Sequence, residues 1–116
     1  MDKIKTTIVL SLGTLILAIS GCSSHTPLYN YGDYSESYYA LKKESTADTA
    51  LEYKQALEYC IKEADDSRSG RVPPGIYANL GYLYLKAGKN KKAVEYFTKE
   101  KSTYPEAAFF MDKMIN

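Results

Sequence analysis

The sequence of 116 residues has no tryptophan, one histidine and two cysteines, and its acidic and basic side chains nearly balance at a formal net charge of +1. The single histidine, His25, and Cys60 stand in unrelated settings, which argues against Ser–His–Asp or Cys–His catalysis. No His, Cys or Asp cluster has the spacing of metal ligands, and the glycines do not form a phosphate-binding loop. The balanced charge gives no electrostatic case for nucleic acid. We therefore expect no enzyme, no cofactor, no metal and no small-molecule substrate.

The amino-terminal segment predicts export and lipidation. Lys3 and Lys5 form a positive start, and the apolar run 8–19 is too short for an ordinary transmembrane helix of about 20 residues. Ile19-Ser20-Gly21-Cys22 then matches the bacterial lipobox, in which the small residues enter the signal peptidase and the Cys22 thiol accepts a diacylglyceryl group. The alternative is a plain signal peptide followed by an incidental cysteine.

The lipobox also predicts how the chain is divided. We expect residues 1–21 to be the lipoprotein signal peptide, 22–30 a lipidated tether, and 31–116 one small helical domain. Lipoproteins kept in the inner membrane often carry Asp after the lipidated cysteine. Ser23 stands there instead, which favours lipid anchoring on the periplasmic face of the outer membrane.

If Cys22 is lipidated, Cys60 has no second cysteine with which to form a disulfide within the chain, even in an oxidising periplasm. It falls on the apolar face of an expected helix. We therefore predict a buried structural thiol, and a disulfide to another molecule is the alternative.

The stretch from Pro74 to Pro105 is the most regular part of the chain. Its apolar residues recur at helical spacing and predict two antiparallel helices, roughly 75–87 and 91–103. Gly88 should end the first helix in the left-handed conformation, and Asn90 should cap the second.

Here the stretch resembles a tetratricopeptide repeat, a hairpin of about 34 residues. The repeat pattern is filled by Tyr77, Leu80, Gly81, Tyr84, Ala93, Phe97 and Pro105. Gly81 and Ala93 are small where the two helices should cross, and the aromatic rings should fill the space around them. Glu100 departs from the small residue usual at its place, which suggests a looser contact with the next helix.

Helical spacing continues on both sides of this hairpin. Residues 46–66 predict a long helix, and 34–66 a degenerate first hairpin in which Tyr34, Tyr38 and Leu41 share a face. Residues 106–115 predict a short last helix whose apolar side chains, Phe109 among them, cap the open apolar face. The expected fold is all-α, with tetratricopeptide-like hairpins and about five helices.

The mature chain also resembles a narrower family, the small Gram-negative lipoproteins grouped as domain of unknown function 4810. The most specific parts of the resemblance are Gly-Asp-Tyr-Ser at 32–35 and Val-Pro-Pro-Gly at 72–75. The resemblance implies an outer-membrane lipoprotein whose gene tends to lie beside lipoproteins similar to the curli secretion pore. It implies no defined activity.

Two functions from different classes follow. The first is a helical adaptor that binds a protein partner, such as a neighbouring envelope lipoprotein, in envelope assembly or secretion. By repeat register, its concave face would be lined by Ala78, Tyr82, Leu85 and Lys86. The second is a module that binds peptidoglycan or another glycan through the tyrosine-rich segment 28–39.

Tyr29, Tyr31 and Tyr34 are the candidates in that segment, either as a binding patch or as rings that cover the hairpin edge. We expect Tyr38 and Leu41 to be core, and Tyr29 and Tyr31 to be more exposed. The lysines 86, 89, 91 and 92 form either a solvated turn or a contact with anionic lipid.

Overall fold

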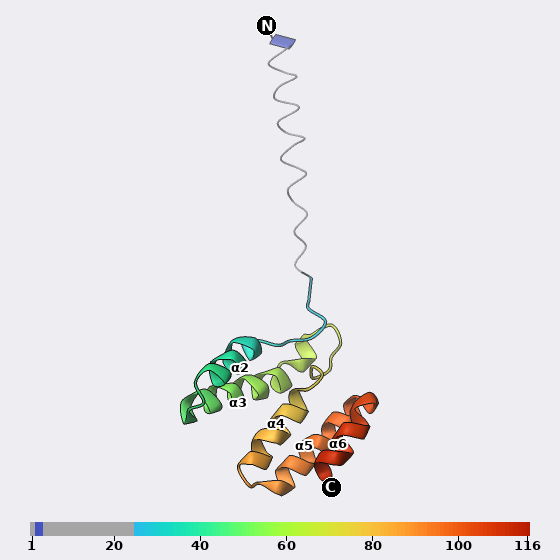
Figure 1. Cartoon of the computed structure of the whole chain (residues 1–116). Coiled ribbons are helices and arrows are strands. Elements are labelled where there is room, and N and C mark those ends of the chain that lie inside the picture. The colour runs from blue at the N-terminus through green and yellow to red at the C-terminus, as the bar shows by residue number, and fades with distance from the viewer. Residues whose placement is uncertain (1, 4–24) are drawn as a thin grey trace.

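The computed structural model describes residues 2–3 and 25–116, and within them the folded part is entirely helical. The helices α2 (Tyr34–Lys43) and α3 (Ala47–Lys62) form a first hairpin, and α4 (Ile76–Lys86) and α5 (Asn90–Thr103) form a second (Figure 1). The short 3-10 helix η1 (Ala64–Asp66) follows α3, and η2 (Pro105–Ala107) leads into α6 (Ala108–Ile115). The predicted all-α fold is confirmed.

The predicted signal peptide, the lipobox and Cys22 lie outside the described residues. Within the part of the chain that the structure describes, no helix has both the length and the apolar character needed to cross a membrane.

The crossing of α4 and α5 is closest at Gly81. A Cβ atom at this position would lie 2.8 Å from Cε1 of the Phe97 ring and 3.2 Å from the carbonyl oxygen of Ala93. Ala93 and Phe97 are each 1% exposed, so neither can move aside into solvent. The small residue predicted at this crossing is therefore required by the packing.

The turn between α4 and α5 is built on Gly88. This glycine has φ +73°, and the amide of Lys89 donates to the carbonyl of Tyr84 at 2.9 Å, which satisfies a carbonyl at the end of α4. The prediction that Asn90 caps α5 is wrong. The carbonyl of Lys89 already accepts from the Ala93 amide at 3.0 Å, so the helix begins one residue early and Asn90 is its first residue.

Glu100, which stands where the repeat pattern usually has a small residue, has a defined place in the packing against α4. Its side chain is 3% exposed and accepts hydrogen bonds from the amides of Gly75 at 2.8 Å and Ala78 at 3.2 Å. Those amides lie at the start of α4, where helix geometry leaves N–H groups without partners. The carboxylate thus caps α4 from α5 and complements the positive end of that helix.

The first hairpin depends on α3. Thr46 and Thr49 form a reciprocal capping box at the start of α3, as each side chain accepts from the backbone amide of the other. Its buried face carries Tyr53, Leu57 and Cys60. The helix ends at Lys62, four residues before the predicted end, because the chain tightens into η1.

The entering chain is fastened to this end of α3 and to the loop after η1. The amides of Arg68 and Ser69 donate to the carbonyls of Pro27 at 2.9 Å and Leu28 at 3.1 Å. The Cys60 thiol donates to the carbonyl of Tyr31 at 3.2 Å. Cys60 is fully buried, as predicted, and burial raises the pKa of its thiol, so the group stays protonated near neutral pH.

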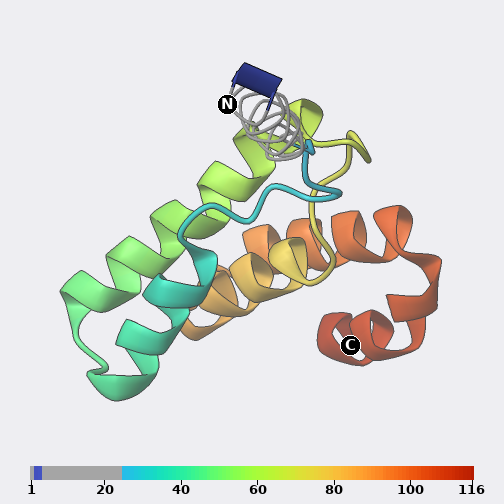
Figure 2. The same ribbon diagram turned by 90° about the horizontal axis from the view of Figure 1, so that it is seen from above.

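One core runs through both hairpins. It includes Leu57 of α3, Leu80 of α4, Phe97 of α5 and Met111 of α6, all 3% exposed or less. Figure 2 shows α2 and α6 on the same side of the domain, with α4 between them.

Charge is divided unequally between the two halves. Residues 28–66 carry nine acidic and four basic side chains, whereas residues 67–116 carry nine basic and four acidic ones. The first segment therefore has a net charge of −5 and the second a net charge of +5. These charges cancel in the overall composition.

Candidate interaction surfaces

The predicted partner-binding residues of α4 occupy its outward face. Tyr82 is 49% exposed, Leu85 is 36% exposed, and the Lys86 ammonium lies 5.8 Å from the centroid of the Tyr82 ring. Ala78 is half-buried and donates its amide to Glu100. We call these four residues the α4 face. The structure brings them together as an apolar strip that ends in a cation.

The three tyrosines predicted in the aromatic segment form a row of ring contacts. The ring centroids of Tyr29 and Tyr31 are 6.3 Å apart, and those of Tyr31 and Tyr34 are 5.9 Å apart. Tyr29 and Tyr34 are half-buried, and Tyr31 is exposed. Partial burial, and then the neighbouring tyrosines, raise the pKa of Tyr31. The row lies beside the α4 face, since the Asn79 side-chain amide donates to the Tyr34 hydroxyl at 3.3 Å.

Tyr38 is not a core residue, contrary to the prediction. It is 41% exposed, although its ring contacts Tyr34 and Tyr53. Tyr53 takes the interior position instead, at 3% exposure, and Leu41 packs partly buried against the core, as predicted. Burial, and then the neighbouring Tyr34, raise the pKa of Tyr53, whose buried hydroxyl has no partner with good hydrogen-bond geometry among the described residues.

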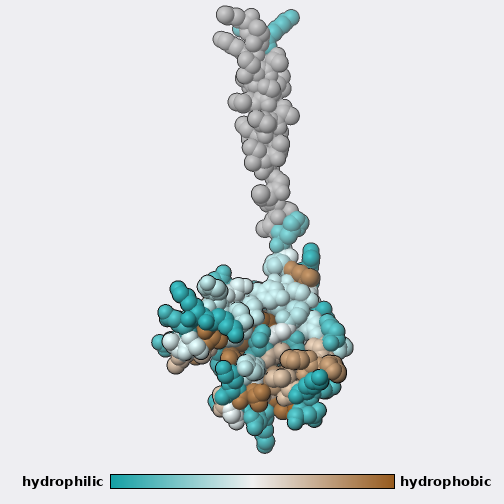
Figure 3. All heavy atoms as spheres, in the orientation of Figure 1, coloured by the Kyte–Doolittle hydropathy of each residue, from teal (hydrophilic) through white to brown (hydrophobic). Residues whose placement is uncertain are grey.

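The last helix exposes more apolar surface than predicted. Met111 is buried, but Phe109 is 75% and Phe110 is 61% exposed. Phe109 therefore does not cap the core, because Met111 already fills that place. Figure 3 shows brown and tan spheres gathered over the α4–α6 part of the domain. Two adjacent exposed phenylalanines are unusual on a small domain and typical of a contact surface.

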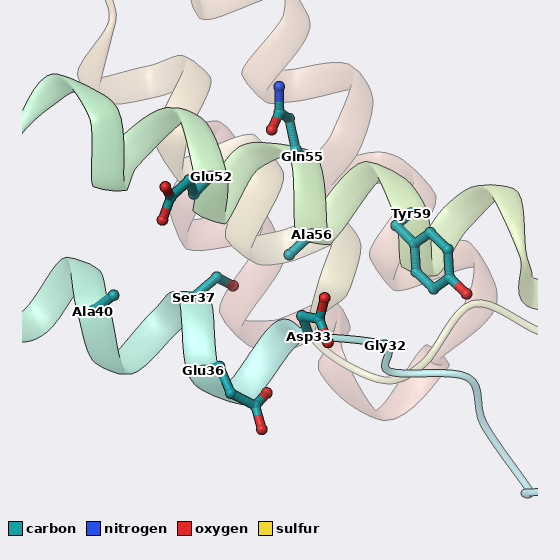
Figure 4. A pocket seen from close by; sticks show the side chains of 9 residues that line it. All are labelled: Gly32, Asp33, Glu36, Ser37, Ala40, Glu52, Gln55, Ala56 and Tyr59. Carbon is teal, nitrogen blue, oxygen red and sulfur yellow. The ribbon is translucent and has the colours of Figure 1, made fainter.

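A groove of about 710 Å³ lies between α2 and α3, on the side that α4 does not cover (Figure 4). Its floor is formed by small side chains where the helices meet, Ser37, Ala40 and Ala56. Its other lining residues are Gly32, Asp33, Glu36, Glu52, Gln55 and Tyr59. Within residues 25–116, no lysine or arginine lines it, and none of the three carboxylates forms an ion pair.

The tyrosine at one end of this groove is held by a glycine. Gly32 has φ +48°, and a Cβ atom at this position would lie 2.6 Å from two carbons of the Tyr59 ring. The ring therefore lies against bare backbone and remains 44% exposed at the groove end. No sequence prediction placed a site here. The signal that could have indicated the groove is a stripe of mostly polar or small residues on each side, spaced three or four residues apart. The stripes are residues 33, 36, 37 and 40 at α2 and residues 52, 55, 56 and 59 on α3.

The basic α4–α5 turn is a further surface, formed by lysines 86, 89, 91 and 92, all of them exposed. The Lys92 ammonium lies 5.0 Å from the centroid of the Tyr84 ring. Figure 1 places this turn at the end of the domain remote from the entering chain. Among residues 2–3 and 25–116, no three His, Cys, Asp or Glu side chains are grouped so that they could hold a metal ion.

Comparison with known proteins gives one family. A family model described as "Domain of unknown function (DUF4810)" matches residues 28–114. The match spans both hairpins and nearly all of α6, so the chain belongs to this family. No curated protein and no solved structure matches the chain.

Proposed function

We propose that this chain is a lipid-anchored, tetratricopeptide-like adaptor of the outer membrane, not an enzyme, which binds another envelope protein. The observation that carries the proposal is the exposed apolar surface of α4 and α6. Tyr82 and Leu85 on α4 and Phe109 and Phe110 on α6 are all at least 36% exposed. Exposed aromatic and aliphatic side chains beside polar ones are typical of the energetically dominant part of a protein interface.

The character of this surface indicates the kind of partner. The α4 face combines two large apolar side chains with one cation, Lys86, and Ala78 leaves room beside them. An amphipathic helix or a strand with apolar anchors suits it better than a free carboxylate, which would need more polar donors. The resemblance to the family suggests a neighbouring lipoprotein similar to the curli secretion pore.

The glycan-binding alternative has less support. The tyrosine rings contact one another, and the backbone around Pro27 and Leu28 is hydrogen-bonded to the loop after η1. Stacking on a sugar requires a free ring face, and only Tyr31, Tyr38 and Tyr39 of this segment are well exposed.

Crosslinking in cells tests the adaptor. A photoreactive residue at Tyr82 or Phe109 should trap one envelope protein, whereas the same residue at the exposed Thr98 of α5 should not. Replacing Tyr82 and Leu85 with serine should abolish the product from Phe109 without lowering the melting temperature by more than about 2 °C, because surface changes cost little stability. Equal trapping at all three positions, or none, would refute the adaptor.

A separate measurement tests the anchor. Cys22→Ser should abolish incorporation of labelled fatty acid and should release the chain from the outer-membrane fraction. If the serine variant still fractionates with that membrane, the lipid anchor is wrong, whatever the crosslinks show.

A further inference from the structure

We infer that the groove between α2 and α3 is a second docking site, which takes a lysine- or arginine-bearing segment of a partner protein. The inference rests on the proposed function only in treating the domain as a protein-binding module. The groove lies apart from the α4 face, because its lining comes entirely from residues 32–59 and from none of α4, α5 or α6.

Charge is the first argument. Asp33, just before α2, and Glu36 of α2 line one side of the groove, and Glu52 of α3 lines the other (Figure 4). None of the three has an ion-pair partner among the described residues, whereas Glu58, Glu95 and Asp112 outside the groove are paired. A groove with three unneutralised carboxylates in a net −5 half favours a cationic occupant.

Shape and ring chemistry narrow the occupant. Ser37, Ala40 and Ala56 leave a trough long enough for a run of side chains rather than for one ion. The exposed Tyr59 ring, held on Gly32, offers a face on which a guanidinium or ammonium can stack while a carboxylate pairs with it. Carboxylates beside an aromatic ring suit the side chains of arginine and lysine.

The basic α4–α5 turn supplies lysines within this chain, but they do not occupy the groove. None of them lines it, and none forms an ion pair with Asp33, Glu36 or Glu52. A second copy that presents its turn is therefore the competing occupant, and the experiment below separates it from a partner segment.

The test uses the full chain in neutral detergent micelles and a fluorescent alanine-rich helical peptide of about 16 residues with lysine at every fourth position. We expect binding that weakens between about 50 and 300 mM salt. Glu36→Gln combined with Glu52→Gln should weaken it on the order of tenfold. Asp65→Asn combined with Asp66→Asn removes the same charge outside the groove and should change it by less than about twofold.

A measurement on the wild-type chain guards against misfolded variants. Carbodiimide coupling of the lysine peptide should join it to Glu36 or Glu52, and not to Asp65 or Asp66. Tyr59→Leu should weaken binding a fewfold, whereas Tyr39→Leu, at a 72% exposed position outside the groove, should not.

Three results would overturn the inference. An equal loss of peptide affinity in the Glu36/Glu52 variant and in the Asp65/Asp66 variant would mean that the peptide is attracted by the overall charge and not by the groove. Displacement of the peptide by an equal concentration of spermidine would mean a small-cation site. Self-association at low salt that Lys89→Glu with Lys91→Glu abolishes would make the occupant a second copy. Failure of the in-cell crosslinks at Tyr82 and Phe109 would leave this peptide result unaffected.

Discussion

The two hairpins reach the same architecture by different means. In the second, α4 and α5 are held by contacts within one short stretch, with Gly81 against Phe97 and Glu100 against the start of α4. In the first, α2 and α3 need residues far away in the sequence. Tyr34 bonds to Asn79, and the chain at 27–31 is fastened to Cys60 and to the loop after η1. A repeat can thus lose its sequence pattern when its neighbours supply the missing contacts.

The same contrast extends to the surfaces. The first hairpin is acidic and leaves an open groove between its helices, whereas the second closes its crossing and carries the basic turn. Tight packing leaves side chains available only on outward faces. Looser packing around small residues leaves a recess.

The largest expected effect is at the closed crossing. Gly81→Leu forces a side chain into the space taken by Phe97 and should cost at least about 3 kcal/mol, at or beyond the upper end of ordinary overpacking. Thermal or urea denaturation followed by circular dichroism measures this. Ala87→Leu, at an exposed position beside the same turn, should change stability by less than about 0.5 kcal/mol. Similar unfolding transitions for the two variants would contradict the close contact of Gly81 with Phe97.

The next effect concerns the buried cap of α4. Glu100→Ala leaves the amides of Gly75 and Ala78 without their acceptor and should cost about 2 kcal/mol. Glu100→Gln keeps one acceptor oxygen and should lose less. Amide hydrogen exchange should show faster exchange at the start of α4 in the alanine variant. Unchanged exchange there would argue that the carboxylate is not the cap.

In the first hairpin, Gly32→Ala should cost about 1–2 kcal/mol, because alanine disfavours φ +48° and its Cβ displaces the Tyr59 ring. Gly70→Ala is the control, since Gly70 has φ +62° but nothing within 4 Å of an added Cβ. It should therefore suffer the backbone strain alone. The difference between the two variants measures the ring contact, and equal losses would mean that Tyr59 moves aside freely.

The smallest effect separates two buried tyrosine hydroxyls. The Tyr104 hydroxyl donates to the carbonyl of Val72 at 2.6 Å, whereas that of Tyr53 is buried with no partner of comparable geometry among the described residues. Tyr104→Phe should cost about 1 kcal/mol, and Tyr53→Phe should be neutral or slightly stabilising. Chemical denaturation resolves the two. A loss in Tyr53→Phe as large as that in Tyr104→Phe would indicate that the Tyr53 hydroxyl has a partner.

Periodicity and turn chemistry were enough to predict the all-α fold, the bounds of the second hairpin within a few residues, and the burial of Cys60. They did not reveal the role of Glu100, and they failed for Tyr38. Glu100 is acceptable in the core only because two free amides meet it there, and Tyr38 loses the interior position to Tyr53, a residue from another helix. Both outcomes depend on tertiary contacts that one helix cannot reveal.

The candidate surfaces divide in the same way. The α4 face follows from the repeat register, so Tyr82 and Leu85 could be named from the sequence. The groove could not, because it exists only where two stripes of small and polar residues from different helices come together. Phe109 was assigned to the cap because its spacing is that of an apolar face, but Met111 fills the single place available.

The division of charge gives the molecule a large electric dipole beneath a net charge near zero. An isoelectric point reflects only the total charge and so does not reveal this separation. A charged surface, in contrast, can bind either the acidic or the basic end of the domain. Near neutral pH the chain should therefore be retained weakly by both anion and cation exchangers, through opposite ends. A nearly neutral protein of this kind can be oriented by its surroundings without being strongly attracted to them.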